Sequence, residues 1–114
     1  MKNTVMIKRN YEFKNLFSKG KFYYGEYIHI YIKKNSSSYN KFGIAVSRKQ
    51  GKAVQRNKIK RYIRESYKNH EEEIEKGNSF LVIINKNVEI KDVKYIDIEK
   101  NMLKTLKIAN LLKS

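Results

Sequence analysis

Residues 42–65 read FGIAVSRKQGKAVQRNKIKRYIRE, and the periodicity of this stretch changes from strand-like to helix-like around Gly51. Before Gly51, apolar and small residues alternate, which predicts a strand over Lys41–Ser47. After it, apolar residues recur every three or four positions, which predicts a helix from Ala53 to about Glu75. The predicted core-facing stripe of this helix consists of Ile59, Ile63, Tyr67, His70 and Ile74.

The other side of the predicted helix is strongly basic. At about 100° per residue, a second set of residues clusters on a largely opposite face: Asn57, Lys60, Arg61, Arg64 and Lys68. The chain has 21 lysines and only 5 arginines, yet four of the arginines fall in one segment: Arg48, Arg56, Arg61 and Arg64. Because the planar guanidinium matches phosphate and base edges better than an ammonium does, this segment is a candidate recognition surface.

The net charge of +15 is distributed unevenly along the chain. Residues 1–68 contain 18 basic and 3 acidic side chains, whereas residues 69–114 contain 8 of each. An even excess would indicate only a generally basic protein. The observed asymmetry favours a polyanion-binding surface in the first part and a neutral remainder that completes the fold.

The composition indicates how many domains, which stabilising cross-links and which cellular location to expect. The sequence has no cysteine, so we expect neither disulfides nor thiolate metal sites, and a chain of 114 residues is expected to form one domain spanning residues 1–114. No stretch approaches the roughly 20 apolar residues of a membrane helix, and the first residues do not look like a signal peptide. We therefore expect a soluble cytoplasmic protein without a membrane partner.

The remaining pattern predicts an α+β sandwich. The expected elements are a helix capped by Asn10 and stopped by Gly20, a strand over Phe22–Lys34, a buried strand over Ser79–Asn85 and a closing helix over Tyr95–Leu112. The loop at residues 35–38 is short enough for a hairpin between the first two strands. The predicted order is α-β-β-α-β-α with helices on a mainly antiparallel sheet, and a further short strand is possible around Phe22–Tyr24.

The motif of residues 42–65 resembles the signature of the bacterial ribonuclease P protein family. In that family, a strand leads through a glycine-containing turn into a helix of the pattern Ala-Val-x-Arg-Asn-Arg-x-Lys-Arg-x-x-Arg. The resemblance implies a fold related to the second domain of a small-subunit ribosomal protein, with a left-handed β-α-β crossover that handedness rules alone would not predict. It also implies a subunit that assists a catalytic RNA in removing the 5′ leader of precursor tRNA.

Two sets of site residues are predicted from the resemblance together with the charge and strand patterns. The first is expected to contact the catalytic RNA near bound metal ions and consists of Arg48, Lys49, Lys52, Arg56, Asn57, Lys58, Lys60, Arg61, Arg64 and Lys68. Lys58 replaces the second arginine of the family motif, so a bidentate contact there would be lost. The second set is expected to line a cleft for the leader and consists of Phe13, Phe17, Tyr31 and Ser47.

The aromatic part of this cleft has an alternative interpretation. Phe13 and Phe17 are four residues apart on a helix, so they fit a core-facing stripe as well as a surface on which bases stack. We expect Tyr31 to face away from the isoleucines of its strand, beside the small residues Ala45 and Ser47. His29 would share that face and is a further candidate for RNA contact.

No residue pattern indicates an enzyme that acts alone. The basic part contains only Glu12, Glu26 and Glu65 as carboxylates, too scattered to suggest a two-metal site. His70 is expected to be structural, and the glutamates at 71–73 and 75 are expected to form a solvated helix end. The expected cofactor is Mg²⁺ held mainly by RNA, the expected partners are ribonuclease P RNA and precursor tRNA, and no small-molecule substrate is expected. A ribosomal-type RNA-binding protein is the alternative.

Overall fold

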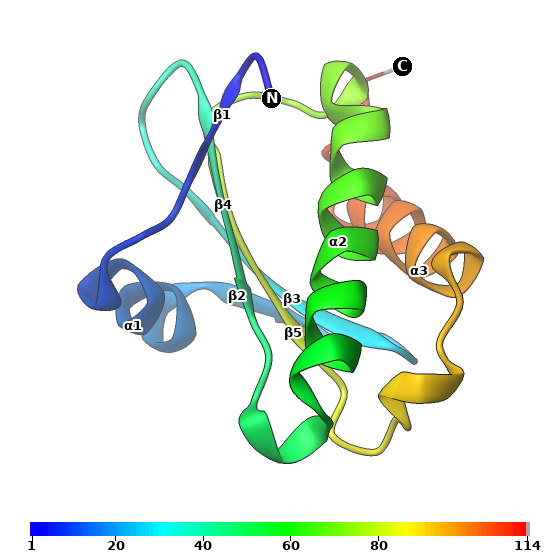
Figure 1. Cartoon of the computed structure of the whole chain (residues 1–114). Coiled ribbons are helices and arrows are strands. Elements are labelled where there is room, and N and C mark those ends of the chain that lie inside the picture. Colours follow the sequence, from blue (N-terminus) through cyan, green and yellow to red (C-terminus); the bar gives the residue numbers. More distant parts are fainter. Residues whose placement is uncertain (114) are drawn as a thin grey trace.

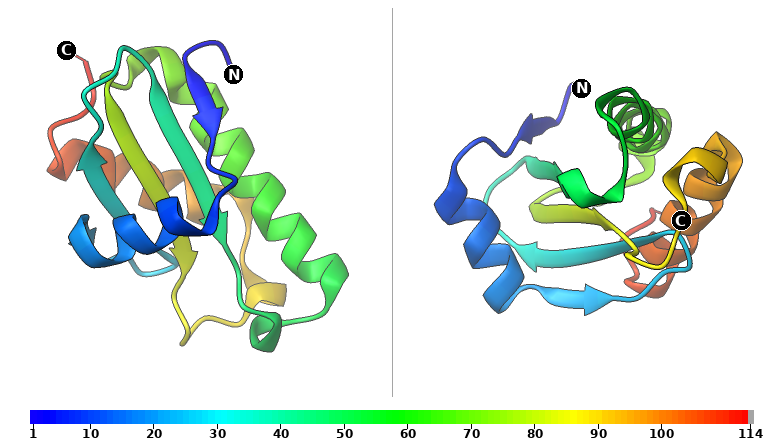
Figure 2. Two further views of the ribbon diagram at one scale, coloured as in Figure 1. Left: turned by 90° about the vertical axis from the view of Figure 1, so that its left-hand side faces the viewer. Right: turned by 60° about the horizontal axis from the view of Figure 1, so that its bottom comes forward.

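The computed structural model describes residues 1–113, which form a five-stranded sheet with helices on both faces (Figure 1). The elements are β1 (Thr4–Met6), α1 (Asn10–Lys19), β2 (Lys21–Tyr23), β3 (Ile28–Lys34), β4 (Asn40–Ala45), the 3₁₀ turn η1 (Arg48–Gln50), α2 (Ala53–His70), the 3₁₀ turn η2 (Glu71–Glu73), β5 (Asn78–Ile84), the 3₁₀ turn η3 (Ile90–Asp92) and α3 (Tyr95–Ile108). The α+β class is confirmed. In Figure 2, α1 lies on one side of the sheet, and α2 and α3 lie on the other.

The strand order is β1-β4-β5-β3-β2, which contradicts the predicted hairpin. β5 lies between β3 and β4, antiparallel to β3 and parallel to β4. All but one of the residues of β5 are buried, so this strand is most stable with neighbours on both sides and helices over both faces. β1 pairs parallel with β4 and β2 pairs antiparallel with β3. The sheet is therefore mixed, and the expectation of a mainly antiparallel sheet was wrong.

β4, α2 and β5 form a β-α-β unit with a left-handed crossover. Seen from the α1 side with both parallel strands running downward, β4 lies to the right of β5 and α2 lies behind the sheet (Figure 2, left). A right-handed connection, which is the general rule, would place β5 on the other side of β4. The crossover implied by the family resemblance is thus confirmed.

The two faces of the sheet have cores of different size. Ile28, Ile30 and Ile32 of β3 point to the side of α2 and α3, where they join the larger cluster of buried residues. The predicted alternation of β3 is therefore confirmed. On the α1 face a smaller cluster is built from Ile7, Leu16 and Leu81. This smaller core leaves part of the α1 face uncovered, and the candidate site lies there.

Several element ends differ from the prediction. Arg9, not Asn10, is the N-cap of α1, and its side chain makes no capping hydrogen bond. Gly20 ends α1 as expected, but with a φ of −72°; its role is close approach, since a Cβ there would lie 2.6 Å from the Leu16 carbonyl oxygen. α2 stops at His70 rather than near Glu75. The chain then turns through η2, and Gly77 adopts a left-handed φ of 88° just before β5.

The strand boundaries also shift. The stretch predicted as one strand over Phe22–Lys34 is divided into β2 and β3, and residues 24–27 belong to neither. The further short strand expected around Phe22–Tyr24 is present as β2, one residue earlier. β5 begins and ends one residue before the predicted range, and α3 ends four residues before Leu112. β1 was not predicted.

Of the four glutamates expected at a solvated helix end, Glu72, Glu73 and Glu75 are exposed, but Glu71 is buried, which corrects the expectation for this residue. Its carboxylate accepts hydrogen bonds from the backbone amides of Lys2 (3.1 Å) and Asn3 (3.2 Å). Burial alone would raise the pKa of Glu71, but hydrogen bonds from Thr4 and these two amides, together with the positive N-terminus, hold the pKa below its ordinary value. The carboxylate therefore fastens the N-terminal segment to the end of α2.

No helix within residues 1–113 is long and apolar enough to cross a membrane.

Candidate nucleic-acid interface

The turn between β4 and α2 is fixed by side-chain hydrogen bonds. Ser47 caps η1, because its hydroxyl accepts from the Lys49 amide (3.2 Å) while its own amide donates to the Gln50 side-chain oxygen (3.2 Å). The side-chain nitrogen Nε2 of Gln50 in turn donates to the Ile84 carbonyl oxygen at 3.4 Å, which ties the turn to the end of β5. The position of the first turn of α2 relative to the sheet follows from these contacts.

Arg56 takes part in the same structure. Its Nη1 donates to the carbonyl oxygen of Gly51 at 2.8 Å and approaches that of Arg48 at 3.4 Å. Arg56 is half-buried, unlike most of the residues expected to bind RNA. One terminal nitrogen of this predicted RNA-contacting guanidinium therefore holds the turn that precedes α2.

The remaining residues of the predicted RNA-contacting set lie around α2 and its leading turn. All are exposed except Lys60, which is half-buried: Arg48, Lys49, Lys52, Asn57, Lys58, Lys60, Arg61, Arg64 and Lys68. Within residues 1–113, none of these cations lies within 4.0 Å of a carboxylate, since the ion pairs there involve only Lys41 and His70 as positive partners. This concentration of unneutralised charge attracts a polyanion.

A shallow groove of about 520 Å³ lies between α1 and α2 on the α1 face of the sheet. It is lined by Phe17, Ile44, Ala45, Val46, Ser47, Gln50, Lys60, Ile83 and Ile84. The Phe17 side chain is 46% exposed, although it is large and apolar. The groove therefore combines an exposed ring, a floor of small and aliphatic residues and a lysine of the basic helix. Sequence reasoning missed Gln50, which joins the site through the η1 turn, and Ile83, which becomes a neighbour of Ala45 through the order of the strands.

The groove brings together only part of the predicted cleft set. Phe17 and Ser47 line it, and Lys60 joins them from α2. Phe13 instead packs half-buried over Gly43, where an added Cβ would lie 2.9 Å from its ring. Tyr31 contacts Phe17 edge to face at a centroid distance of 5.0 Å.

Tyr31 does not lie beside Ala45 and Ser47, as expected from a β3–β4 hairpin. Its neighbour across the strand pair is Leu81 of β5, and on the other side of Leu81 lies Gly43 of β4. The central strand thus separates the tyrosine from the small residues. Tyr31 consequently supports the Phe17 ring from the side and does not face the groove floor.

The aromatic surface extends beyond the predicted cleft. Phe22 contacts both Tyr31 and His29, at centroid distances of 5.1 Å in each case, and Tyr24 lies 4.9 Å from His29. Sequence reasoning placed Phe22 and Tyr24 in a strand without assigning them to the site. The run of aromatic residues at 22–24 was the available signal.

The two histidines have different surroundings. His29 accepts a hydrogen bond from the Gly25 amide at Nδ1 (3.1 Å), and burial lowers its pKa. It therefore belongs to the aromatic surface as a neutral ring near pH 7. His70 is half-buried and pairs through Nε2 with Glu99 of α3 at 3.2 Å, which fits the structural role expected for it.

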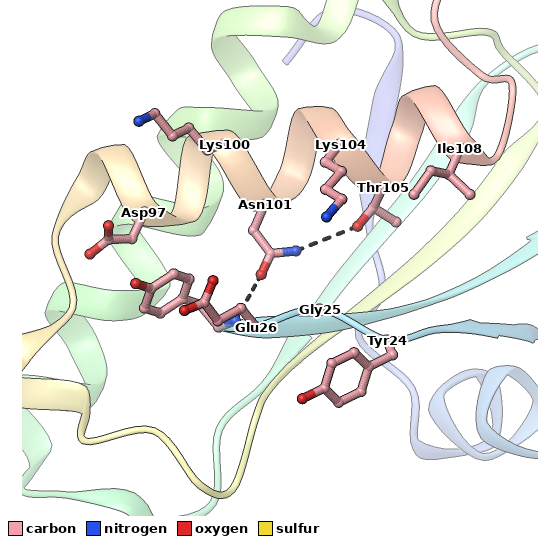
Figure 3. A pocket seen from close by; sticks show the side chains of 10 residues that line it. Tyr24, Gly25, Glu26, Asp97, Lys100, Asn101, Lys104, Thr105 and Ile108 are labelled. Carbon is pink, nitrogen blue, oxygen red and sulfur yellow. Dashed lines mark hydrogen bonds between the residues drawn. The ribbon is translucent and has the colours of Figure 1, made fainter.

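A second hollow, of about 430 Å³, lies between the β2–β3 connection and α3 (Figure 3). It contains none of the predicted site residues and mixes two carboxylates, Glu26 and Asp97, with two lysines. At its base the Asn101 side-chain oxygen accepts from the amides of Tyr27 (2.8 Å) and Ile28 (3.0 Å). This asparagine holds the start of β3 against α3, so its evident role is structural.

The whole chain is similar to proteins of one family. The ribonuclease P family model matches residues 1–110. The ribonuclease P protein component of Clostridioides difficile (strain 630) is 37% identical over 109 residues, which cover 95% of this chain and 94% of the relative. The solved structure of the Staphylococcus aureus RNase P protein has a TM-score of 0.83 at 34% identity, covering 95% of this chain and 97% of that one. The RNase P protein of Thermotoga maritima has a TM-score of 0.82 at 33% identity, covering 91% and 96%.

Proposed function

The chain belongs to the ribonuclease P protein family and takes part in the ribonuclease P holoenzyme. We propose that it binds the catalytic RNA through α2 and the 5′ leader of precursor tRNA through the groove. In this proposal the RNA subunit carries out the cleavage in the cytoplasm, and the protein supplies binding and electrostatic support. The membership also decides against the ribosomal-type alternative.

The observation that carries the proposal is the composition of the groove. Phe17 is a half-exposed ring at the edge of a floor of small and aliphatic residues, and Lys60 lies at the opposite edge. A ring offers a stacking surface that tolerates every base, and a nearby cation favours the phosphate that follows it. These are the requirements of a site for single strands of varied sequence, as tRNA leaders are.

α2 supports the second half of the proposal. Its outward face presents arginines and lysines that no carboxylate within residues 1–113 neutralises, and each phosphate contact would release a counterion. Asn57, exposed among these cations, suits a base edge or a metal-bound water better than a phosphate. Tyr62 is approached by Lys58 (5.7 Å) and Arg61 (5.8 Å), which orders both long side chains along the helix.

The donor set of the groove does not fit a protein-held Mg²⁺. Mg²⁺ prefers carboxylate and phosphate oxygens, whereas the polar lining of the groove consists of Ser47, Gln50 and Lys60. Within residues 1–113, no group of three or more aspartate, glutamate, histidine or cysteine side chains is arranged to hold a metal. We therefore keep the proposed Mg²⁺ on the RNA and assign it no step on this chain.

The test is cleavage of a precursor tRNA by a bacterial ribonuclease P RNA at low magnesium, with and without the protein. We expect strong stimulation that the protein alone does not reproduce. Phe17→Ala should weaken binding of leader-containing substrate about tenfold, because a lost base–ring stack costs about 1.4 kcal/mol at the lower end of the usual range. The same variant should bind leaderless tRNA like the wild type.

The matched control is Tyr39→Ala, which removes another partly exposed ring, 39% accessible, from the loop before β4. This variant should keep full leader affinity. Absence of stimulation by the wild-type protein, with binding to other structured RNA intact, would contradict the proposed function.

A further inference from the structure

We propose that single-stranded RNA leaving the groove continues across β3 and β2 on a row of five rings and that this row ends at Tyr24. In order from the groove, the rings are Phe17, Tyr31, Phe22, His29 and Tyr24. The inference rests on the proposed function of the groove and extends the leader-binding surface to the opposite edge of the sheet.

The row is continuous. Successive centroids are 5.0, 5.1, 5.1 and 4.9 Å apart, each within the range of aromatic contact. The ring planes of the first three pairs are inclined by 56–61°, so Phe17 and Tyr31 meet edge to face, the two pairs of Phe22 are tilted, and none of the three stacks face to face. Ring faces that are not used internally remain available to bases.

The register of the sheet places these rings on the same face as the groove. Phe22 of β2 lies directly across from Tyr31 of β3, and His29 lies directly across from Ile83 of β5, which lines the groove. The surface from Ile83 to Phe22 therefore crosses three adjacent strands. With strands about 4.8 Å apart, this extension is about 10 Å wide.

The outer end of the row is exposed. Phe22 is 46% accessible and Tyr24 is 73% accessible, and the two rings are neighbours of His29 on one face of the sheet. Lys19 and Lys21 are exposed, but the Lys21 ammonium lies 5.3 Å from the ring centroid of Tyr23, on the opposite face of β2 from Phe22. Exposed rings on one face of the sheet offer stacking surfaces to the bases of a single strand, whatever its sequence.

Acidic residues gather on one side of Tyr24, at the end of the row. Tyr24 borders a hollow of about 470 Å³ that is also lined by Glu26, Glu89, Asp92 and Asp97. These are four of the eleven acidic residues of the chain, and they have the same charge as phosphate. A strand that enters this hollow would meet repulsion, whereas the hollow on the α3 side that Tyr24 also lines contains Lys100 and Lys104. The row itself offers stacking places for about two further bases, on Phe22 and Tyr24.

The test uses the holoenzyme reconstituted with a bacterial ribonuclease P RNA and precursor tRNAs whose leaders are shortened one nucleotide at a time. For the wild type, affinity should rise with leader length in two steps, first for the groove and then for the row. The variants are Phe22→Ala, Tyr24→Ala and the double variant, with Tyr39→Ala as control. The double variant should lose the second step, roughly tenfold in affinity, and keep the first.

The outcomes separate this inference from the proposed function. An absence of any leader dependence in the wild type would contradict the groove itself. A normal first step, with the double variant equal to the wild type at every length, would overturn only the row. An equal loss at every length, including leaderless tRNA, would also overturn it, because the rings would then act on assembly or folding. Tyr24→Ala, which removes the most exposed ring, keeps the test valid if Phe22→Ala unfolds.

Discussion

Arg56→Ala should destabilise the fold, whereas Arg61→Ala should not, although both arginines belong to the same basic segment. Arg56 donates from Nη1 to the Gly51 carbonyl at 2.8 Å, and the contact to the Arg48 carbonyl at 3.4 Å is at the limit of a hydrogen bond. A hydrogen bond from a charged donor contributes about 1.5 to 3 kcal/mol, and the half-buried position favours the lower end. We therefore expect a loss of about 1.5 kcal/mol for Arg56→Ala.

The assay is urea unfolding of the free protein combined with RNA binding at several salt concentrations. A loss of 1.5 kcal/mol corresponds to a fall of roughly 1 M in the urea midpoint, for a slope of about 1.5 kcal/mol per molar. Arg61→Ala should change stability by less than about 0.5 kcal/mol and reduce the salt dependence of RNA binding by about one unit. An Arg56→Ala variant with an unchanged urea midpoint and the binding defect of Arg61→Ala would refute this assignment.

Three further predictions concern groups whose partners the structure identifies. Asn101→Ala should cost about 3 kcal/mol in unfolding free energy, because it leaves two backbone amides at the start of β3 without their acceptor; urea unfolding measures this. Glu71→Ala should cost about 1 kcal/mol at pH 7 for the same reason at the N-terminus. Since the folded pKa of Glu71 is lowered, its contribution should be complete above the unfolded value near 4.5 and disappear as the pH falls through the folded pKa, so wild type and variant should converge in acid. His29 has a lowered pKa, so protonation favours the unfolded chain and stability should decline as the pH falls below about 6.5; His29→Phe should reduce this decline in urea midpoints compared at pH 7.5 and 5.5.

The sequence predicted the elements better than their arrangement. Alternation in β3 and the apolar stripe of α2 report directly which side chains are buried, so Ile30 and Ile63 were placed correctly. The order of the strands depends instead on which strand is buried between two others, and a local sequence pattern does not report this. The loop before β4 contains no Asn-Gly or Asp-Gly pair to fix a hairpin, so its length alone suggested a pairing that β5 prevents.

The same limit applies to the site. Phe13 and Phe17 occupy equivalent positions on one face of α1, and no local pattern distinguishes a core ring from a binding ring. The distinction arises because Gly43 lies under Phe13 and leaves space for its ring, whereas Phe17 extends over the edge of the groove. Arg56 is the opposite case, a residue predicted to bind RNA that also has a structural role. Its position in a basic motif did not indicate that it donates to the carbonyl groups of Gly51 and Arg48.

The short length of β1 explains how a groove on one face of the sheet reaches a helix on the other. β1 pairs with β4 only from Asn40 to Phe42, and the Ile7 amide continues the contact at the Phe42 carbonyl (2.8 Å). The rest of β4 up to Ala45 is therefore an open edge on this side. Beyond the end of β4 the chain turns through η1 into α2 on the other face of the sheet, and Lys60 of α2 lines a groove whose ring comes from α1. A longer β1 would cover this edge and separate the cations of α2 from the aromatic surface. The two proposed RNA-binding surfaces are therefore continuous because β1, which the sequence did not predict, has only three residues.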